Sequence, residues 1–269
     1  MISLNLTGTT RLNIIIGAPI AQVKSPGGVT QAFTDRGHDA VLVPVQIDGA
    51  HLKAFLTAAT AVSNLDGIIV TVPHKFACYD FCASSTERSR LLGSVNIMRR
   101  RPDGGWHGDI VDGIGFVGAV RANGGDPAGK RALQIGAGGA GSAIAMALVE
   151  AGVGSLAIHD TDVARRDQLI RKLKTLGRGE ILAGTADPTG FDLVANATPL
   201  GMTVGDPLPI DVSKLTSGAF VGCVITSPAV SPLIEAARRR GCPTSTGIDM
   251  YNALQNSMLD FLLADGGSR

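Results

Sequence analysis

The chain has 269 residues, a formal net charge of +1 and 45% hydrophobic residues, enough for two medium domains whose cores need neither disulfides nor metals. The near-neutral charge argues against non-specific nucleic-acid binding, and 4% aromatic residues are too few for base-stacking platforms. No apolar run approaches the roughly 20 residues that span a bilayer, and no basic segment followed by an apolar stretch marks a signal peptide at the N-terminus. We therefore expect a cytoplasmic protein that binds neither nucleic acid nor membranes.

Short β-branched and apolar runs alternate with helix-like stretches along the chain. In the first part, strands are expected at 12–16, 40–46, 67–72 and 94–98, and helices at 28–36 and 49–61. In the second part, strands are expected at 131–135, 155–159, 192–195 and 219–225, and helices at 113–123, 139–151, 161–176, 231–240 and 251–263. Continuous apolar runs of this kind are typical of strands buried on both faces of a parallel sheet.

A segment rich in glycine and charge, 99–113, separates the two series. We expect two α/β domains, the second a Rossmann-type doubly wound parallel sheet. The first would comprise 1–111 and 247–269, because the last helix follows a Gly/Pro/Ser/Thr-rich break and is expected to return to it, and the second would comprise 112–246. The arginines 99–101 are expected on a solvated hairpin edge rather than in an anion site.

A glycine-rich turn between an expected strand and an expected helix carries the clearest motif. It fits the GxGxxG pattern, in which the first glycine permits the tight turn and the second lets the backbone approach a pyrophosphate. The N–H groups at the start of the following helix would face the phosphates. The residues expected to bind the cofactor here are Gly136, Ala137, Gly138, Gly139 and Ala140.

An acidic residue completes this fingerprint. Asp160 ends the next expected strand, where a carboxylate can accept hydrogen bonds from the ribose hydroxyls of NAD and would repel the 2′-phosphate of NADP. The nearby Arg165 and Arg166 would soften that repulsion. We therefore expect NAD to be preferred over NADP.

A lysine at the end of an apolar strand marks a candidate chemical site in the first domain. Lys75 follows the strand at 67–72, and ligands of open α/β sheets lie at the carboxyl ends of strands. Asp112 lies in the segment between the domains, where a cleft would form. A carboxylate orients an ammonium group and burial favours the neutral amine, so such a pair can transfer a proton.

No pattern in the sequence indicates a metal site or a hydrolase. None of the four cysteines forms a CxxC pair. We expect the cysteines to be small buried hydrophobic residues and the protein to lie in a reducing compartment. The histidines lack metal-ligand spacing, and no metal is expected. His74 is expected to be structural.

Six motifs in order resemble the shikimate/quinate dehydrogenase family over essentially the whole chain. The glycine-rich turn is one, and the other five are 17–20 with Ser25-Pro26 (GAPI…SP), 70–75 (VTVPHK), 93–96 (GSVN), 112–116 (DGIGF) and 196–202 (NATPLGM). The resemblance implies a two-domain enzyme in which a nicotinamide exchanges hydride with an alicyclic substrate of the shikimate or quinate kind.

The resemblance also implies roles for individual residues. Lys75 and Asp112 would be the proton-transfer pair, Ser25 would bind the substrate carboxylate, and Thr71 and Asn96 would bind substrate hydroxyls. Further substrate contacts are expected from Thr226 and Gln255. Thr198, Val224 and Gly247 would line the cofactor.

The sequence departs from the family pattern at polar positions. Val23 replaces the first serine of the entry motif, Ile69 replaces an asparagine, and Thr226 replaces a substrate-facing tyrosine. Counting from Gly247, the family's glutamine falls on Leu254 with Gln255 one residue later, so either one is a candidate for the substrate-facing position. The remaining departures are Ile110-Val111 for Asn-Thr and His159-Asp160-Thr161 for Asn-Arg-Thr.

These losses remove partners for substrate hydroxyls and carboxylates while keeping the Lys–Asp pair. We expect hydride chemistry on an altered, less polar substrate or weak activity on shikimate. The alternatives are a family member with a different alicyclic or polyol substrate, and a nucleotide-binding module without turnover. The oligomeric state, monomer or homodimer, stays open.

Overall fold

The computed structural model describes residues 6–264, in which the chain divides into two compact units. Unit 1 is Met1–Val111 with Gln255–Arg269, and unit 2 is Asp112–Leu254. The units divide within the last helix, α9 (Gly247–Leu263), rather than at its start. Residues 1–5, part of the segment where no signal peptide is expected, lie outside the described residues. Within residues 6–264, no helix is both long and apolar enough to cross a membrane.

Unit 1 contains a six-stranded sheet whose parallel and antiparallel strands are mixed. In spatial order the strands are β2 (Ala40–Gln46), β1 (Arg11–Gly17), β3 (Leu65–Val70), β5 (Ile97–Arg100), β6 (Trp106–Asp109) and β4 (Ser84–Ser85). β1 pairs in parallel with β2 and β3, whereas β5 runs antiparallel to β3 and β6. The segment 99–113 thus contains most of a β-hairpin. The arginines 99–101 lie on or next to β5, but β5 pairs with strands on both sides and the three side chains are only partly exposed, so the expected solvated edge is not observed.

Helices complete unit 1. They are α1 (Ser25–Asp35), α2 (Gly49–Thr60), α3 (Lys75–Tyr79), α4 (Glu87–Leu92) and the C-terminal half of α9. Ile68 and Val70 of β3 point into a core that includes Leu52 and Leu56 of α2. Gly67, on the opposite side of β3, lies against Leu262 of α9. Both faces of the sheet are therefore covered, which explains its continuous apolar strands.

Several short elements were not predicted from the sequence: α3, α4 and the strands β4, β6, β9 (Glu180–Ala183) and β12 (Thr244–Ser245). The signals for α4 were present, because Thr86 accepts from Ser89 N–H as N-cap and Gly93 ends the helix at φ 69°. The strand expected at 94–98 begins only at Ile97, because Ser94 N–H still donates to the Ser89 carbonyl of α4.

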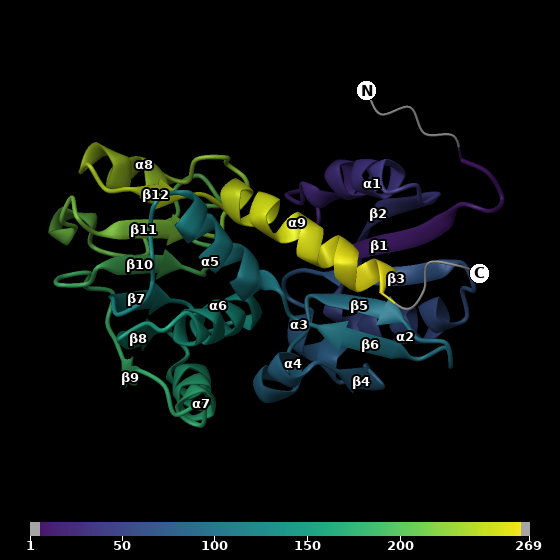
Figure 1. Ribbon diagram of the computed structural model, residues 1–269, viewed down its shortest axis with the longest axis horizontal. Coiled ribbons are helices and arrows are strands. Elements are labelled where there is room, and N and C mark those ends of the chain that lie inside the picture. Colours follow the sequence, from purple (N-terminus) through teal and green to yellow (C-terminus); the bar gives the residue numbers. More distant parts are fainter. Residues whose placement is uncertain (1–5, 265–269) are drawn as a thin grey trace. The chain divides into compact units, whose positions relative to one another are not determined.

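Unit 2 is the expected doubly wound parallel sheet. Its strand order is β12, β11 (Phe220–Cys223), β10 (Leu193–Asn196), β7 (Arg131–Ile135), β8 (Ser155–His159) and β9, and every neighbouring pair is parallel. Figure 1 shows these strands side by side in the left-hand part of the picture. The order reverses between β7 and β10, which is the switch point where nucleotides bind in such sheets.

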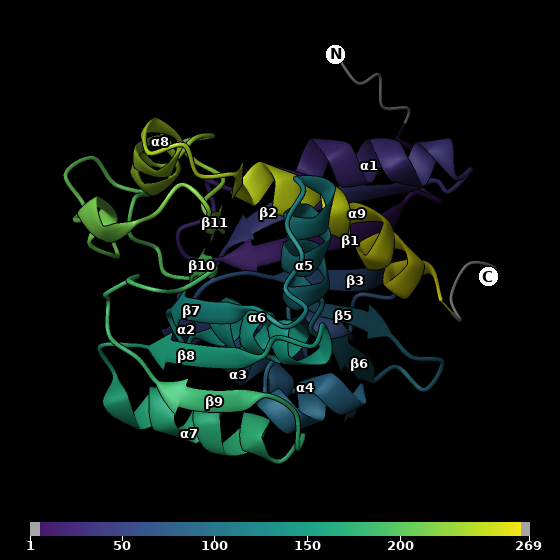
Figure 2. The same cartoon turned by 60° about the vertical axis from the view of Figure 1, so that its left-hand side comes forward.

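Helices cover both faces of the second sheet. They are α5 (Asp112–Ala122), α6 (Gly139–Glu150), α7 (Val163–Lys174) and α8 (Pro232–Arg239), with a single 3₁₀ turn η1 (Val212–Lys214). In β11, Gly222 lies against Phe116 of α5, whereas Val221 and Cys223 pack with Leu233 of α8. Figure 2 shows α6 and α7 along β7, β8 and β9. The Rossmann topology predicted from the sequence is therefore present.

Candidate functional site

The glycine-rich turn links β7 to α6 with a backbone that only glycine permits. Gly136 has φ 102°, and a Cβ atom there would lie 2.8 Å from the Ala197 carbonyl oxygen. A side chain on Gly141 would collide with the Gly136 carbonyl, so the helix starts directly against the turn. Nothing lies within 4 Å of the position that a Cβ of Gly138 would take, and no side chain caps this end of α6. The open space and the uncapped helix start fit a pyrophosphate.

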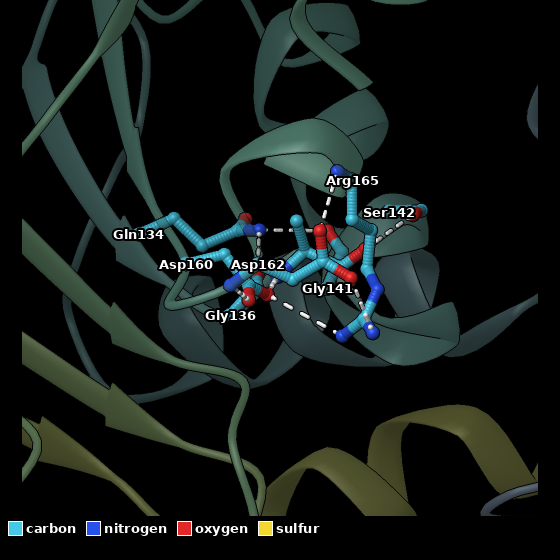
Figure 3. Close-up of polar contacts among 8 residues, drawn as sticks. Gln134, Gly136, Gly141, Ser142, Asp160, Asp162 and Arg165 are labelled. Atoms are coloured by element: carbon cyan, nitrogen blue, oxygen red, sulfur yellow. Dashed lines mark hydrogen bonds and ion pairs between the residues drawn. The ribbon is translucent and has the colours of Figure 1, made fainter. Parts of the chain in front are cut away.

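A buried glutamine holds the turn together. Gln134 is completely buried in β7, and its Nε2 donates to the carbonyls of Gly136 and Gly141, both at 2.8 Å. Figure 3 shows this amide between the two ends of the turn. This role of Gln134 was not predicted from the sequence. A polar residue inside an otherwise apolar strand was the available signal.

The carboxylate of Asp160, the residue after β8, is hydrogen-bonded to backbone N–H groups. It accepts from Ala137 N–H at 2.6 Å and from Asp162 N–H at 2.8 Å. Arg165 lies beside it, with Nη1 at 3.9 Å from Asp160 Oδ2 and Nη2 at 2.9 Å from Asp162 (Figure 3). Arg165 is about half exposed, whereas Arg166 is largely buried and bonds to Asp167. Asp160 therefore fixes the turn, and its charge is offset by a cation.

The other expected cofactor residues gather at the carboxyl ends of the central strands. Thr198 lies against Gly136, and its hydroxyl donates to Asn196 Oδ1 at 2.7 Å. Val224 N–H donates to the Asn196 carbonyl at 3.1 Å. A Cβ on Gly247 would collide with the Val224 carbonyl, so only glycine permits this approach. The structure thus brings Thr198, Val224 and Gly247 from separate parts of the sequence to the edge of the unit 2 sheet where Gly136 lies.

Lys75 lies at the carboxyl end of β3 in unit 1, as predicted. It is the first residue of α3, and its side chain is buried although a lysine is normally exposed. Its carbonyl accepts from Val95 N–H at 3.0 Å, which ties α3 to the 93–96 segment. His74 is buried and its Nε2 bonds to the Ile47 carbonyl at 2.7 Å, in agreement with a structural role.

Asn96 joins three strand ends around Lys75. Its carbonyl accepts from Val70 N–H at 2.7 Å and its N–H donates to the Asp109 carbonyl at 2.9 Å. Its side-chain Oδ1 accepts from Val111 N–H at 2.9 Å, immediately before Asp112. Asn96 is therefore held rigidly, as a ligand-positioning side chain must be.

Thr71 and Ser25 also lie in unit 1. Thr71 follows β3, and its methyl group packs against Gly17 at the end of β1. Ser25 begins α1, where it is buried, and its hydroxyl has no hydrogen-bond partner among residues 6–264. Buried hydroxyls are nearly always paired, so the Ser25 hydroxyl is available to a ligand.

Leu254 and Gln255, the two candidates for the substrate-facing position, differ in their packing. Leu254 is buried against Gly115 of α5 in unit 2. Gln255 Nε2 donates to the carbonyl of Gly28 at 2.8 Å, in the first turn of the helix that Ser25 begins. Gln255 is thus the residue that reaches a polar neighbour beside Ser25.

Asp112 and Thr226 belong to unit 2. Asp112 begins α5 and is buried, and Thr226 follows β11 and is partly exposed. Of the departures from the family pattern, Ile69 is buried in β3 on the same side of the strand as Gly67 and Thr71. The apolar replacement thus lies on the face of β3 that leads to Thr71.

A buried ion pair next to the site was missed. Asp109 accepts from Arg88 Nε at 2.7 Å, from Thr86 Oγ1 at 2.5 Å and from Ile110 N–H at 2.7 Å. Since the Asp109 carbonyl also receives the Asn96 N–H, this carboxylate anchors the strand end that positions Asn96. Nothing in the spacing of these residues signalled the pair, because the partners meet only in the folded sheet.

The cysteines offer no reactive or metal-binding site in the described part of the chain. Burial raises the pKa of Cys78 and of Cys82 to about 12, so both stay protonated thiols. Cys223 and Cys242 are buried as well. Among residues 6–264, no group of three His, Cys, Asp or Glu side chains could hold a metal ion.

Comparison with known proteins gives a consistent result. Residues 15–98 match the family model of the shikimate dehydrogenase substrate-binding domain. Shikimate dehydrogenase (NADP(+)) of Rubrobacter xylanophilus is 36% identical over 90% of this chain and 87% of its own.

Solved structures show the same fold. Shikimate 5-dehydrogenase of Listeria monocytogenes, in complex with shikimate and NAD, is 26% identical with a TM-score of 0.84, over 97% of this chain and 94% of its own. The 5-ketofructose reductase of Gluconobacter sp. strain CHM43 is 27% identical with a TM-score of 0.81, over 96% and 95%.

The comparisons overturn the expected preference for NAD over NADP. The relatives at 32–36% identity, including that of Rubrobacter, are named as NADP(+) enzymes. The structure supplies the physical reason, because a preference for NAD requires the Asp160 carboxylate to face the ribose. Instead it accepts two backbone N–H groups and lies beside Arg165, so it is not an unscreened anion. The expectation drawn from Asp160 was therefore wrong.

Proposed function

Because this chain belongs to the shikimate dehydrogenase family, we propose that it is an NADP(H)-dependent dehydrogenase that oxidises a ring hydroxyl of an alicyclic hydroxy acid or polyol, or reduces the corresponding ketone. The observation that carries the proposal is the buried lysine at the end of β3, held by its backbone against the 93–96 segment. Lysine is seldom buried, and the carboxyl end of a strand is where ligands of open α/β sheets bind.

Lys75 would move the proton of the reaction. In the oxidation direction, the substrate hydroxyl gives its proton to the neutral Lys75 Nζ while its carbon loses a hydride. Nicotinamide chemistry supplies the hydride acceptor. In the reduction direction the Lys75 ammonium returns the proton to the forming alkoxide. Asp112 is the proposed partner that orients the ammonium.

The substrate would be held mainly by unit 1. The unpaired Ser25 hydroxyl would bind a carboxylate or hydroxyl, and Thr71, Asn96 and Gln255 would bind ring hydroxyls. Thr226 would add a contact from unit 2. Ser25 and Gln255 lie on helices, and Thr71, Asn96 and Thr226 lie next to strand ends, which favours a defined substrate orientation.

Unit 2 would hold the nucleotide. The turn from Gly136 to Ala140 and the start of α6 would receive the pyrophosphate, and Thr198, Val224 and Gly247 would line the nicotinamide end. Arg165 is the half-exposed cation closest to Asp160, and it would pair with the 2′-phosphate of NADP by leaving Asp162.

A second substrate class is favoured by the departures at Val23, Ile69 and Thr226. Val23 and Ile69 each lack a hydrogen-bonding group that a carboxylated, hydroxylated ring would use, and the Thr226 hydroxyl sits on a shorter side chain than that of a tyrosine. The similarity to 5-ketofructose reductase makes a polyhydroxy ketone without a carboxylate the second candidate.

A substrate panel tests the proposal. Shikimate, quinate and 5-ketofructose would be assayed at 340 nm with NADP(H) and NAD(H). We expect turnover of at least one substrate, and kcat/KM for shikimate below the roughly 10⁴–10⁸ M⁻¹s⁻¹ usual for natural substrates.

The variant Val23→Ser separates the two substrate classes. It should raise kcat/KM for shikimate, because a second hydroxyl beside Ser25 restores the carboxylate contact, and leave that for 5-ketofructose unchanged. Efficient use of shikimate by the native enzyme would refute the altered site, and no turnover of any compound would refute the enzymatic proposal.

A further inference from the structure

Tyr251 in α9 has a hydroxyl for which the fold supplies no partner. The hydroxyl oxygen is buried and makes no hydrogen bond to any of residues 6–264. The native state pairs almost all buried hydroxyls, so each exception calls for an explanation such as a ligand or a water molecule. The only other tyrosine of the chain, Tyr79, does not share this feature.

The position of Tyr251 on α9 indicates which ligand. Gly247, Tyr251 and Gln255 follow one another at intervals of four residues, so they lie along one face of the helix. At one end, Gly247 N–H donates to the Ile225 carbonyl at 3.2 Å, directly before Thr226. At the other end, Gln255 bonds to Gly28 in the helix that begins with Ser25. Tyr251 lies one turn from a proposed cofactor residue and one turn from a proposed substrate residue.

The chemistry of the hydroxyl suits a polar substrate group. Burial raises the pKa of Tyr251, so at neutral pH the phenol is protonated and can both donate and accept.

We propose that Tyr251 is a specificity-determining residue whose hydroxyl hydrogen-bonds to a hydroxyl, carbonyl or carboxylate oxygen of the bound alicyclic or polyol substrate. The inference rests on the proposed function and adds a substrate contact to it.

Tyr251→Phe, with Tyr79→Phe as the matched control, tests the contact. The assay uses the panel compound that the native enzyme turns over best. Removing the Tyr251 hydroxyl should lower kcat/KM by about tenfold or more, mainly through a raised KM, because one hydrogen bond to the substrate is lost. The KM for NADP should stay within about twofold, and Tm of the ligand-free protein should not fall, because no bond within the protein is removed.

A spectroscopic readout makes the test independent of turnover. Protein labelled with ¹³Cζ-tyrosine gives two signals, assigned by Tyr79→Phe, and the Tyr251 signal should move when the same compound is added. An unchanged kcat/KM in Tyr251→Phe, a static Tyr251 signal, or a lowered Tm of the free variant would each overturn the inference while native turnover upholds the proposed function. Native protein that neither turns over nor responds to any panel compound would overturn both.

Discussion

At the scale of single residues, burial sets the candidate site residues apart from most residues of the same types on the surface. Lys75, Ser25 and Asp112 are all buried, although each residue type is usually exposed. Hydroxyls and charges lose water contacts on burial, and the fold keeps them only where they are paired or meet a ligand. A buried polar residue therefore needs a partner, which is structural for Asp109 and is proposed to be a ligand for Ser25.

Replacing Lys75 should separate proton transfer from binding. Lys75→Met keeps most of the side-chain volume and removes the amine, and kcat should fall by about 100-fold or more because general acid–base catalysis typically contributes 10²–10⁴. The dissociation constant for NADP, measured by fluorescence titration, should hardly change. A kcat equal to that of the native enzyme would remove Lys75 from the mechanism, and Lys53→Met on α2 serves as the exposed control.

At the scale of elements, the short segments around the site are too short to be stable alone and are held in place by side-chain contacts. Helix α4 has six residues, too few to be stable alone, and depends on its caps and on the Arg88–Asp109 pair. The same carboxylate holds the end of β6, so α4 and the strand that positions Asn96 are stabilised together.

Asp109→Asn should therefore destabilise unit 1. The substitution keeps the shape but removes the buried charge that Arg88 contacts, and the cost should be about 3 kcal/mol, the lower part of the range for buried pairs because a third of Arg88 is exposed. Urea unfolding measures the change. Asp103→Asn, in the exposed pair with Arg101, should have little effect. Equal effects of the two substitutions would contradict the anchoring role.

The segment after β9 makes a pH-dependent contact with η1. Asp187 accepts from Lys214 Nζ and Thr189 Oγ1, both at 2.6 Å, and the pKa of Asp187 is lowered to about 2. A carboxylate with a lowered folded-state pKa stabilises the protein above its ordinary pKa, near 3.8, and loses this contribution as the pH falls through about 2.

The difference in Tm between native protein and Asp187→Asn should accordingly be constant near neutral pH and shrink between about pH 4 and pH 2. Thermal scans across this range measure it. A difference that stays constant down to pH 2 would show that the interaction is not ionic.

At the scale of the whole molecule, ligand binding should report on the cofactor. NADP at about 100 times its dissociation constant should stabilise the folded nucleotide-binding unit by about 2.7 kcal/mol. At equal concentrations NADP should raise Tm more than NAD, and Arg165→Ala should reduce the NADP effect more than the NAD effect, because only NADP carries the 2′-phosphate. An equal rise of Tm with NADP in the native protein and in Arg165→Ala would show that Arg165 does not bind the 2′-phosphate.

The sequence by itself determined the α/β class, the parallel Rossmann sheet, the glycine turn and the position of Lys75 at a strand end. These features depend on local signals: apolar runs between glycine-rich turns, and motifs whose glycines are required by the backbone at Gly136 and Gly141. Only the tertiary structure decided where each polar group is directed. It placed Asp160 against the backbone, paired Arg88 with Asp109 and left the hydroxyls of Ser25 and Tyr251 without a partner among residues 6–264, because hydrogen bonds between distant segments form only when the chain is packed.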